Sequence, residues 1–295
     1  MNRKALLIIN PCSGRRQGVK YLVDILNMFD RAGYSISLHL TAKRLDATRL
    51  AEEFGPASDL IVCIGGDGTF NEVIVGMMRG KVRAPIGYIP LGSTNDFASS
   101  LNIPKHWRDA VFAILNGAPK AIDICRFNER YFSYVASCGA FAKTSYSTPQ
   151  NLKNALGHLA YILEGAKDIS AIRPLGLKIE LPDETIEGEF IFAACSNATT
   201  VGGVLRLDPK LVDMNDGKME LMLIPSPNNA LHFGKVLQCL QTKKYEAPYV
   251  IFKSSPTAEI YTDGTFDWSL DGEKYTGSKK ISAAVEHSAI SIILA

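Results

Sequence analysis

The chain has no cysteine pair spaced as C-x-x-C, no long apolar run and no segment dominated by one charge. Its six cysteines are scattered among mostly apolar neighbours, a pattern typical of reduced thiols in the cytosol. No apolar run approaches the roughly 18 residues that a membrane-spanning helix needs. The sequence therefore predicts a cytoplasmic protein, and any contact with a membrane is expected to be peripheral.

Basic and acidic residues are nearly balanced, at 32 Lys and Arg against 30 Asp and Glu, and the two signs are well mixed. Without a polybasic tail or face, nucleic acid is not expected as a partner. The five histidines are isolated and lack metal-ligand spacing, so zinc and hydrolase sites are not expected. The early apolar run Ala5–Ile9 is too short for a signal peptide and ends at Asn10-Pro11, which favours a first β-strand.

Strand-like and helical segments alternate in the first third of the chain. The strand-like runs are Ala5–Ile9, Ser35–Leu40, Leu60–Ile64 and Ile86–Ile89, and helical periodicity is found at Val19–Arg31, Leu45–Phe54 and Asn71–Met78. This alternation predicts a mostly parallel sheet with helices on its faces, because a parallel crossover needs a connection of helix length. The loops at the carboxyl ends of the strands then form the ligand crevice.

The pattern of the sequence changes at about Ala121. Short segments rich in β-branched or aromatic residues, separated by turns such as Asp263-Gly264, predict an antiparallel sheet domain. Two helical stretches, Leu152–Ile169 and one near Ala230–Leu240, interrupt it. The final strand, Ala289–Leu294, has no obvious partner in the sequence.

A glycine-rich loop follows the apolar strand Leu60–Ile64 and leads into a helical segment. Glycines let backbone N–H groups approach phosphate oxygens, and the following helix offers the positive end of its dipole. A plain turn with a helix cap is the alternative, but the position suits a phosphate loop. Its candidate nucleotide contacts are Gly65, Gly66, Asp67, Gly68, Thr69, Asn71 and Glu72.

Further candidate contacts follow other strands of the predicted sheet. They are Asn10, Pro11, Ser13 and Gly14 after the first strand, Thr41 after the second, and Gly92, Ser93, Thr94 and Asn95 after Ile86–Ile89. Adjacent parallel strands end side by side, so these residues are expected to converge on one crevice. A helix N-cap explains Thr41 equally well. Asp67 and Asp96 would repel a nucleotide there unless a divalent cation lies between, which is the physical case for Mg²⁺.

Three ordered motifs resemble the diacylglycerol kinase catalytic family, which includes sphingosine and ceramide kinases and small bacterial lipid kinases. They are N-P-x-S-G from Asn10, G-G-D-G-T-x-N-E from Gly65 and P-L-G-x-x-N-D-F-A from Pro90. The G-G-D-G core alone is shared with NAD kinases and 6-phosphofructokinases, but the flanking residues are similar to those of the lipid kinases.

The resemblance covers nearly the whole chain and implies a two-domain fold. An α/β nucleotide-binding domain like that of 6-phosphofructokinase and NAD kinase is expected at residues 1–122, and the segment 286–295 is expected to return to it. A β-sandwich domain for the lipid substrate is expected at residues 123–285. The family places the active site in the cleft between its two domains, and its members are often dimers, so a homodimer is an expectation that the sequence itself leaves open.

The resemblance also implies two magnesium sites. Asp67, Asp96 and Asp123 match the positions that hold a catalytic Mg²⁺ through waters, although Asp123 lies in an apolar run where a buried structural ion pair is the alternative. Asp213 and Asp216 lie three residues apart in an N-D-G loop that is usually just a turn. The family places a structural Mg²⁺ on these two acids and on the backbone carbonyl of the residue aligned with Lys218.

The D-G-E motif at Asp271 to Glu273 is the candidate for the catalytic base, although a hairpin turn is the structural alternative. A carboxylate hydrogen-bonded to the lipid hydroxyl accepts its proton while the hydroxyl attacks the γ-phosphate of ATP. Asp271 is assigned this role and Glu273 is the second candidate, because turn geometry decides which side chain faces the substrate.

The resemblance predicts a Mg²⁺-dependent kinase that transfers the γ-phosphate of ATP to diacylglycerol or a related lipid alcohol at the membrane surface. The product would be phosphatidic acid, in phospholipid biosynthesis. A kinase with a soluble substrate, of the NAD kinase type, is one alternative. A catalytically silent nucleotide-binding regulator is another, but the presence of Asp67, Asp96 and Asp271 argues against it.

Overall fold

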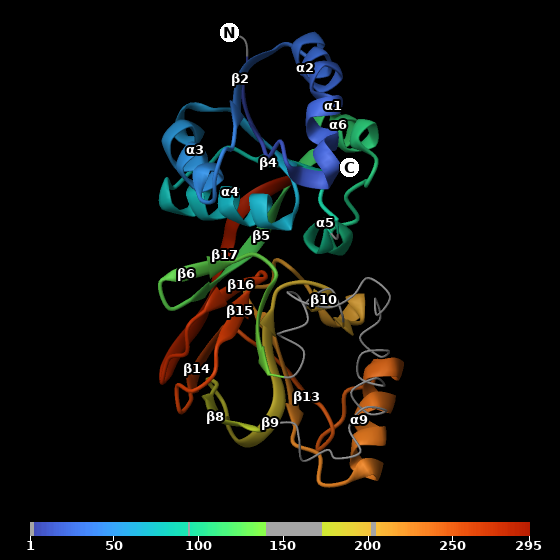
Figure 1. Cartoon of the computed structure of the whole chain (residues 1–295), viewed down its shortest axis with the longest axis vertical. Coiled ribbons are helices and arrows are strands. Elements are labelled where there is room, and N and C mark those ends of the chain that lie inside the picture. Colours follow the sequence, from blue (N-terminus) through green and yellow to red (C-terminus); the bar gives the residue numbers. More distant parts are fainter. Residues whose placement is uncertain (1–2, 94, 140–172, 202–204) are drawn as a thin grey trace. The chain divides into compact units, whose positions relative to one another are not determined.

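The computed structural model of the chain describes residues 3–93, 95–139, 173–201 and 205–295 (Figure 1). The chain divides into two compact units, the first made of Met1–Ile124 with His287–Ala295 and the second of Cys125–Glu286. Thr94 and the expected helix Leu152–Ile169 lie outside the described residues.

The first unit is built on a parallel sheet. Its strands are β1 (Arg3–Ile9), β2 (Tyr34–Leu40), β3 (Leu60–Gly65) and β4 (Ile86–Pro90), in the spatial order β2-β1-β3-β4. Ile9 lies opposite Leu40 on one side and Ile64 on the other, and Ile64 lies opposite Ile89. Because the strands end in register, the loops that follow them leave the same edge of the sheet.

Helices cover both faces of this sheet (Figure 1). The helices of the first unit are η1 (Ser13–Arg16), α1 (Gln17–Lys20), α2 (Leu22–Arg31), α3 (Asp46–Phe54), η2 (Gly55–Ala57), α4 (Asp67–Arg79), α5 (Asp96–Ser100) and α6 (Trp107–Asn116). On one face, α2 and α6 bury side chains such as Phe29 and Val111 in a shared core with Leu7 and Val62 of the sheet. On the other face, α3 packs against α4.

The second unit consists mainly of antiparallel strands. They are β6 (Arg130–Phe132), β7 (Val135–Gly139), β8 (Leu175–Glu180), β9 (Thr185–Ser196), β10 (Thr200–Val201), β11 (Leu205–Arg206), β12 (Met219–Pro225), β13 (Ile251–Ser255), β14 (Thr257–Tyr261), β15 (Trp268–Leu270) and β16 (Glu273–Tyr275), with η4 (Pro209–Leu211) and α9 (Ala230–Thr242) between them. The long strand β9 is central, since it pairs with β7, β8 and β12. Phe127, Phe132 and Trp268 lie in the core that these strands enclose.

Two strands run through both units, β5 (Ala118–Phe127) and β17 (Lys280–Leu294). β17 pairs antiparallel with β14 in the second unit and parallel with β4 in the first, where Ile292 lies opposite Ile86. The final strand, which had no partner in the sequence, therefore extends the parallel sheet. The predicted fold class, a parallel α/β unit followed by an antiparallel unit, is confirmed.

Candidate active site

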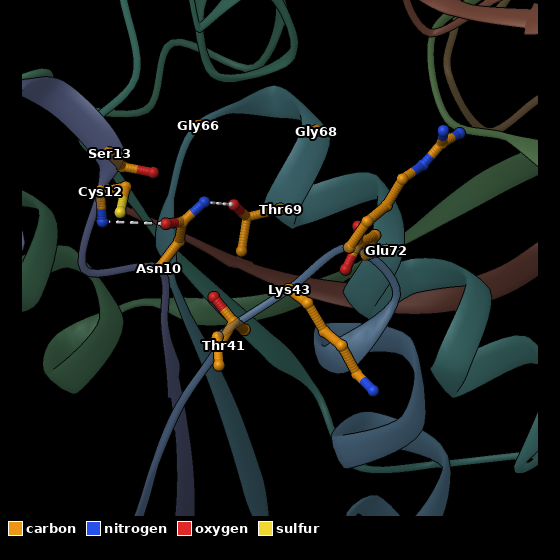
Figure 2. Close-up of a pocket in the computed structure, with 11 residues that line it drawn as sticks. Asn10, Cys12, Ser13, Thr41, Lys43, Gly66, Gly68, Thr69 and Glu72 are labelled. Atoms are coloured by element: carbon orange, nitrogen blue, oxygen red, sulfur yellow. Dashed lines mark hydrogen bonds between the residues drawn. The ribbon is translucent and has the colours of Figure 1, made fainter.

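A pocket of about 460 Å³ opens in the first unit, beside the carboxyl ends of β1, β2 and β3 (Figure 2). Its lining residues are Asn10, Cys12, Ser13, Thr41, Ala42, Lys43, Arg44, Gly66, Gly68, Thr69 and Glu72. Seven of these, all but Cys12, Ala42, Lys43 and Arg44, are predicted nucleotide contacts. The convergence of these three loops follows from the strand register.

Asn10 joins the loop after β1 to the first turn of α4. Its Nδ2 donates a hydrogen bond of 3.1 Å to Thr69 Oγ1, and its Oδ1 accepts one of 3.0 Å from the Cys12 amide. Figure 2 shows the Asn10 side chain directed at the Thr69 hydroxyl. The backbone amide of Asn10 donates to Ile64 O at 3.0 Å, which fixes the start of the loop against β3.

The described residues of the loop after β4 pack against the phosphate loop and are not among those that line the pocket. A Cβ on Gly92 would lie 2.6 Å from Gly66 Cα, and a Cβ on Gly14, where φ is +55°, would lie 1.9 Å from Leu91 O. Asn95 adopts a left-handed conformation and holds Gly92 by two hydrogen bonds of 2.9 Å, one to its amide and one to its carbonyl. Only glycine allows these backbones to pack so closely.

Eight other predicted contacts within the described residues do not line the pocket. They are Pro11, Gly14, Gly65, Asp67, Asn71, Gly92, Ser93 and Asn95. Asn71 is buried in α4, and its Oδ1 has no hydrogen-bond partner in the described part of the chain. These residues shape the backbone around the pocket, so the motif read in the sequence is as much a packing requirement as a set of contacts.

The N-terminus of α4 faces into the pocket through Gly66, Gly68 and Thr69. The first N–H groups of a helix have no partner within the helix and carry the positive end of its dipole, which suits phosphate. Open space surrounds Gly68, where an added Cβ would meet nothing within 4 Å. The pocket therefore offers backbone donors with room for an anion beside them.

The basic residues Lys43 and Arg44 also line the pocket, and neither was among the residues predicted from the sequence. They follow Thr41 by two and three residues in the loop after β2. Asp46 stabilises this loop by accepting hydrogen bonds from the amides of Ala42 at 2.8 Å and Lys43 at 3.0 Å, and these bonds lower the pKa of its carboxyl. A basic pair directly after a candidate strand end was the signal that could have identified them.

Glu72 lines the pocket but its carboxylate caps another helix. Its oxygens accept hydrogen bonds from the amides of Leu45 at 2.9 Å and Ala47 at 3.2 Å, at the start of α3. Thr41 is not the N-cap of this helix, because α3 begins at Asp46 and its N-cap residue is Leu45, whose own side chain makes no capping hydrogen bond. Thr41 instead ends β2 with its amide donating to Ile9 O at 2.9 Å, beside the pocket.

Asp67 and Asp96 are joined through the backbone. The Asp67 carboxylate accepts hydrogen bonds from the amides of Asp96 at 3.1 Å and Phe97 at 3.3 Å, so it caps α5. Burial raises the pKa of Asp67, and the same two amides act in the opposite direction. The loop that follows β4 is thereby fixed to the phosphate loop.

Asp123 is completely buried in β5 and has partners that the sequence did not suggest. Its Oδ1 lies 2.9 Å from His287 Nδ1 and accepts a hydrogen bond of 2.7 Å from the amide of Ser288. The structure thus gives Asp123 the structural partner that was the alternative to a metal role. A role through water stays a prediction for Asp67, Asp96 and Asp123.

Among residues 3–93, 95–139, 173–201 and 205–295, no three His, Cys, Asp or Glu side chains gather closely enough to hold a metal ion directly. Both predicted sites depend on waters or on a carbonyl, so this does not test them. In the loop before β12, Asp213 accepts from the amide of Asn215 at 3.0 Å and Asp216 from that of Lys218 at 2.9 Å. Two exposed carboxylates beside a carbonyl are the oxygen donors that Mg²⁺ prefers, so the loop fits the group.

The D-G-E motif forms the hairpin between β15 and β16. Asp271 has φ of 47° and Gly272 has φ of 84°, the pair of positive values that a tight two-residue hairpin turn requires. The turn does not expose Asp271, whose side chain is buried in the second unit. The structural alternative is therefore correct as far as the backbone is concerned, and it places a carboxylate inside the protein.

Four hydrogen bonds surround the Asp271 carboxylate. Oδ2 accepts from the amide of Ser133 at 2.6 Å and from its hydroxyl at 2.8 Å, and Oδ1 accepts from the amides of Tyr134 at 3.1 Å and Val135 at 2.9 Å. Burial raises the pKa of Asp271 to about 6, against these bonds, which lower it. A buried carboxyl that titrates near neutrality suits proton transfer.

Glu273 lies on β16 and is more accessible than Asp271. Its Oε2 accepts a hydrogen bond of 2.9 Å from Arg130 Nη2, and its side chain is 26% exposed. The guanidinium of Arg130 also donates to the carbonyl of Lys274 at 3.2 Å, which holds the pair against the hairpin.

A parallel α/β unit with a glycine-rich loop, a helix N-terminus and basic residues around one pocket is typical of nucleotide-dependent phosphate-binding proteins. Residues 4–127 match the family model of the diacylglycerol kinase catalytic domain. The diacylglycerol kinase of Bacillus subtilis (strain 168) is 34% identical over 273 residues, covering 92% of this chain and 90% of that relative. The diacylglycerol kinase of Staphylococcus aureus (strain MRSA252) is 31% identical over 275 residues, covering 92% and 87%.

Solved structures share the fold over the whole chain. A crystal structure of a diacylglycerol kinase from Bacillus anthracis strain Sterne has a TM-score of 0.78 at 21% identity, covering 100% of this chain and 97% of that one. Another from the same organism has a TM-score of 0.84 at 22% identity. The chain belongs to the diacylglycerol kinase family and is therefore a kinase, for which ATP is the expected phosphoryl donor.

None of the helices in the described ranges combines the length and the apolar character needed to cross a bilayer.

Proposed function

We propose that this kinase transfers the γ-phosphate of ATP to the hydroxyl of diacylglycerol, or of a related lipid alcohol, giving phosphatidic acid for phospholipid biosynthesis. The observation that carries the proposal is the pocket in which Asn10 and the N-terminus of α4 meet, in a chain whose relatives are diacylglycerol kinases. The reaction requires a neutralised phosphate chain and an oriented hydroxyl, since the protein itself does little covalent chemistry.

The pocket of the first unit holds the phosphates of ATP. The amides at Gly66, Gly68 and Thr69 are the donors at the helix N-terminus, and Lys43 and Arg44 supply the cationic side chains. Thr41, Ser13 and Asn10 supply hydroxyl and amide groups at the ends of the neighbouring strands. The remaining motif glycines keep these loops close enough for one anion to contact all of them.

Magnesium belongs to the proposal at two places. When bound, Mg²⁺ neutralises charge on the transferring phosphates. Asp67 and Asp96 adjoin the phosphate loop and would hold it through waters, with Asp123 as the third acid of the predicted set. Asp213, Asp216 and the carbonyl of Lys218 would hold a second ion that orders their own loop.

Asp271 is the proposed base and Glu273 the second candidate. A carboxylate has about four acceptor positions, and all four on Asp271 are filled in this structure. Of the four donors, only the Ser133 hydroxyl can turn away by rotation about a single bond, whereas the three amides are fixed in the backbone. We therefore assign Ser133 the role of opening Asp271 to the substrate proton.

The lipid substrate places the reaction at a membrane surface, with the protein in the cytoplasm and in peripheral contact with the bilayer. A homodimer stays a prediction for this chain, as does the absence of nucleic acid from its partners.

A phosphotransfer assay tests the proposal. Purified protein is supplied with ATP labelled in the γ-phosphate, Mg²⁺, and a panel containing diacylglycerol, monoacylglycerol, ceramide and a sphingoid base in mixed micelles, with NAD in a parallel reaction. We expect labelled phosphatidic acid. Label in another lipid would change the substrate and keep the mechanism, label in NAD would favour the soluble-substrate alternative, and label in no product would favour the silent regulator.

A further inference from the structure

Glu220 is a charged residue at the centre of the antiparallel sheet of the second unit. It is the second residue of β12, where it lies opposite Ser196 of β9 and Ser254 of β13. It is only 1% exposed, and its neighbours along β12 are apolar. A carboxylate in such a place is costly unless a proton, a partner or a cation compensates its charge.

The carboxylate of Glu220 is only half satisfied. The side chain of Ser254 bonds to it, but Oε2 is buried and has no hydrogen-bond partner in the described part of the chain. Buried oxygens are nearly always paired, so an unpaired one indicates a group that is part of a larger site.

The charges nearest to Glu220 make its burial harder instead of easier. The carboxylates of Asp216 and Asp213 act on Glu220, and both repel a negative charge on it. Lys218, two residues before Glu220, donates its amide to Asp216 at 2.9 Å, which fixes Asp216 at the entry to β12. Three acids thus belong to one short segment, Asp213 and Asp216 at the surface and Glu220 inside.

These three acids do not meet closely enough in the described structure to bind a metal directly, whereas a bridging water could join the inner one to an ion at the outer two. We propose that Glu220 is the inner anchor of the cation site on the 213–218 loop, and that its Oε2 accepts a hydrogen bond from a water bound to the cation. The proposal deepens the magnesium assignment made above and rests on that part of it.

A cation held in this way would restrain the 213–218 loop. β12 lies between β9 and β13, so an ion held jointly by the loop and by Glu220 ties the loop to the middle of the sheet. Partners in the outer shell of a metal site orient the ligands and typically change metal affinity by about 10–100-fold when they are removed. Glu220 is thus a positioning residue for the cation and has no contact with the reacting groups.

Binding of Mn²⁺ to the full-length chain, measured by calorimetry without ATP or lipid, tests the proposal. The variant Asp213→Asn/Asp216→Asn identifies the binding that belongs to the loop. We expect Glu220→Gln to weaken that binding by about tenfold or more. The matched control is Glu187→Gln, an exposed glutamate on β9, which we expect to bind as the wild type does. Thermal melts with and without Mg²⁺ should show the same ranking.

Unchanged Mn²⁺ affinity in Glu220→Gln would overturn the proposal, and so would a wild type that binds no more Mn²⁺ than the double loop variant. If Glu220→Gln does not fold, Glu220→Asp retains the charge and withdraws it by one methylene group. Its affinity should then fall below that of the wild type, and equal affinity would contradict the proposal. Since the assay contains no substrate, its result is independent of whether the chain phosphorylates a lipid.

Discussion

The hydroxyl of Ser133 donates a hydrogen bond of 2.8 Å to Oδ2 of Asp271, from a position 138 residues earlier in the chain. The amide of the same serine donates to the same oxygen at 2.6 Å. One residue therefore fills both acceptor positions of this oxygen, and a rotation of its hydroxyl frees one of them. The carboxylate of Asp271 is thus fixed in position, and it can accept a substrate proton only after the Ser133 hydroxyl has turned away.

Removing this hydroxyl separates its effect on access to Asp271 from its effect on the pKa of Asp271. In Ser133→Ala we expect activity at pH 8 to stay within about threefold of the wild type, because an acceptor position is left open. Loss of a hydrogen bond to the ionised form raises the pKa of Asp271 further, so the acid limb of the kcat/KM profile, expected near pH 6 in the wild type, should move upward by about one pH unit.

The sign of this shift follows from the role of the base. Below its pKa, Asp271 is protonated and accepts no proton, so activity falls with falling pH. Ser137→Ala, at a buried serine on β7, is the control and should leave the limb in place. Equal losses of activity at every pH in Ser133→Ala would refute the account of its hydroxyl.

Changing two glycines of the phosphate loops to alanine should have different effects, one on stability and the other on ATP binding. Gly92→Ala places a Cβ 2.6 Å from Gly66 Cα, and we expect the free energy of unfolding to fall by about 1–3 kcal/mol. Gly68→Ala meets nothing within 4 Å in the protein, so stability should change by less than about 0.5 kcal/mol.

In Gly68→Ala the added methyl group occupies the space proposed for phosphate, so ATP should bind about tenfold more weakly. Chemical denaturation and ATP titration of both variants measure the two quantities. Normal ATP binding by a stable Gly68→Ala protein would place the phosphates elsewhere.

Cys12 reports directly on occupancy of the pocket. It is exposed and lines the pocket, whereas the other five cysteines are buried. We expect iodoacetamide to modify one thiol in the native protein and ATP with Mg²⁺ to slow the reaction by about tenfold at saturation. Mass spectrometry with Cys12→Ser as the control identifies the site, and an unchanged rate with ATP present would argue against nucleotide in this pocket.

The parts of the fold that depend on local pattern could be predicted from the sequence. The strand predicted at Leu60–Ile64 is observed as Leu60–Gly65, and that at Ile86–Ile89 as Ile86–Pro90, because buried parallel strands are continuous apolar runs. The helix expected at Val19–Arg31 is divided into α1 and α2, and α6 was not anticipated.

Side-chain contacts between residues far apart in the sequence could not be predicted. Asp123 meets His287 at a separation of 164 residues, and the pairing depends on the register of β17, which no local pattern encodes. Nor does any local pattern encode the contact between Ser133 and Asp271, which lie 138 residues apart in the chain. Conversely, Gly92 and Asn95 were recognised as motif residues, but only the closeness of Gly92 to Gly66 shows that their loop packs against the phosphate loop.

A single-turnover measurement of phosphate transfer tests the central claim most directly. Enzyme in excess over γ-labelled ATP is mixed with diacylglycerol micelles and Mg²⁺, and labelled phosphatidic acid is followed for the wild type, Asp271→Asn and Glu273→Gln. We predict rapid transfer by the wild type, a loss of about 10²–10⁴-fold in Asp271→Asn and a smaller loss in Glu273→Gln. Transfer by Asp271→Asn at the wild-type rate would contradict the account.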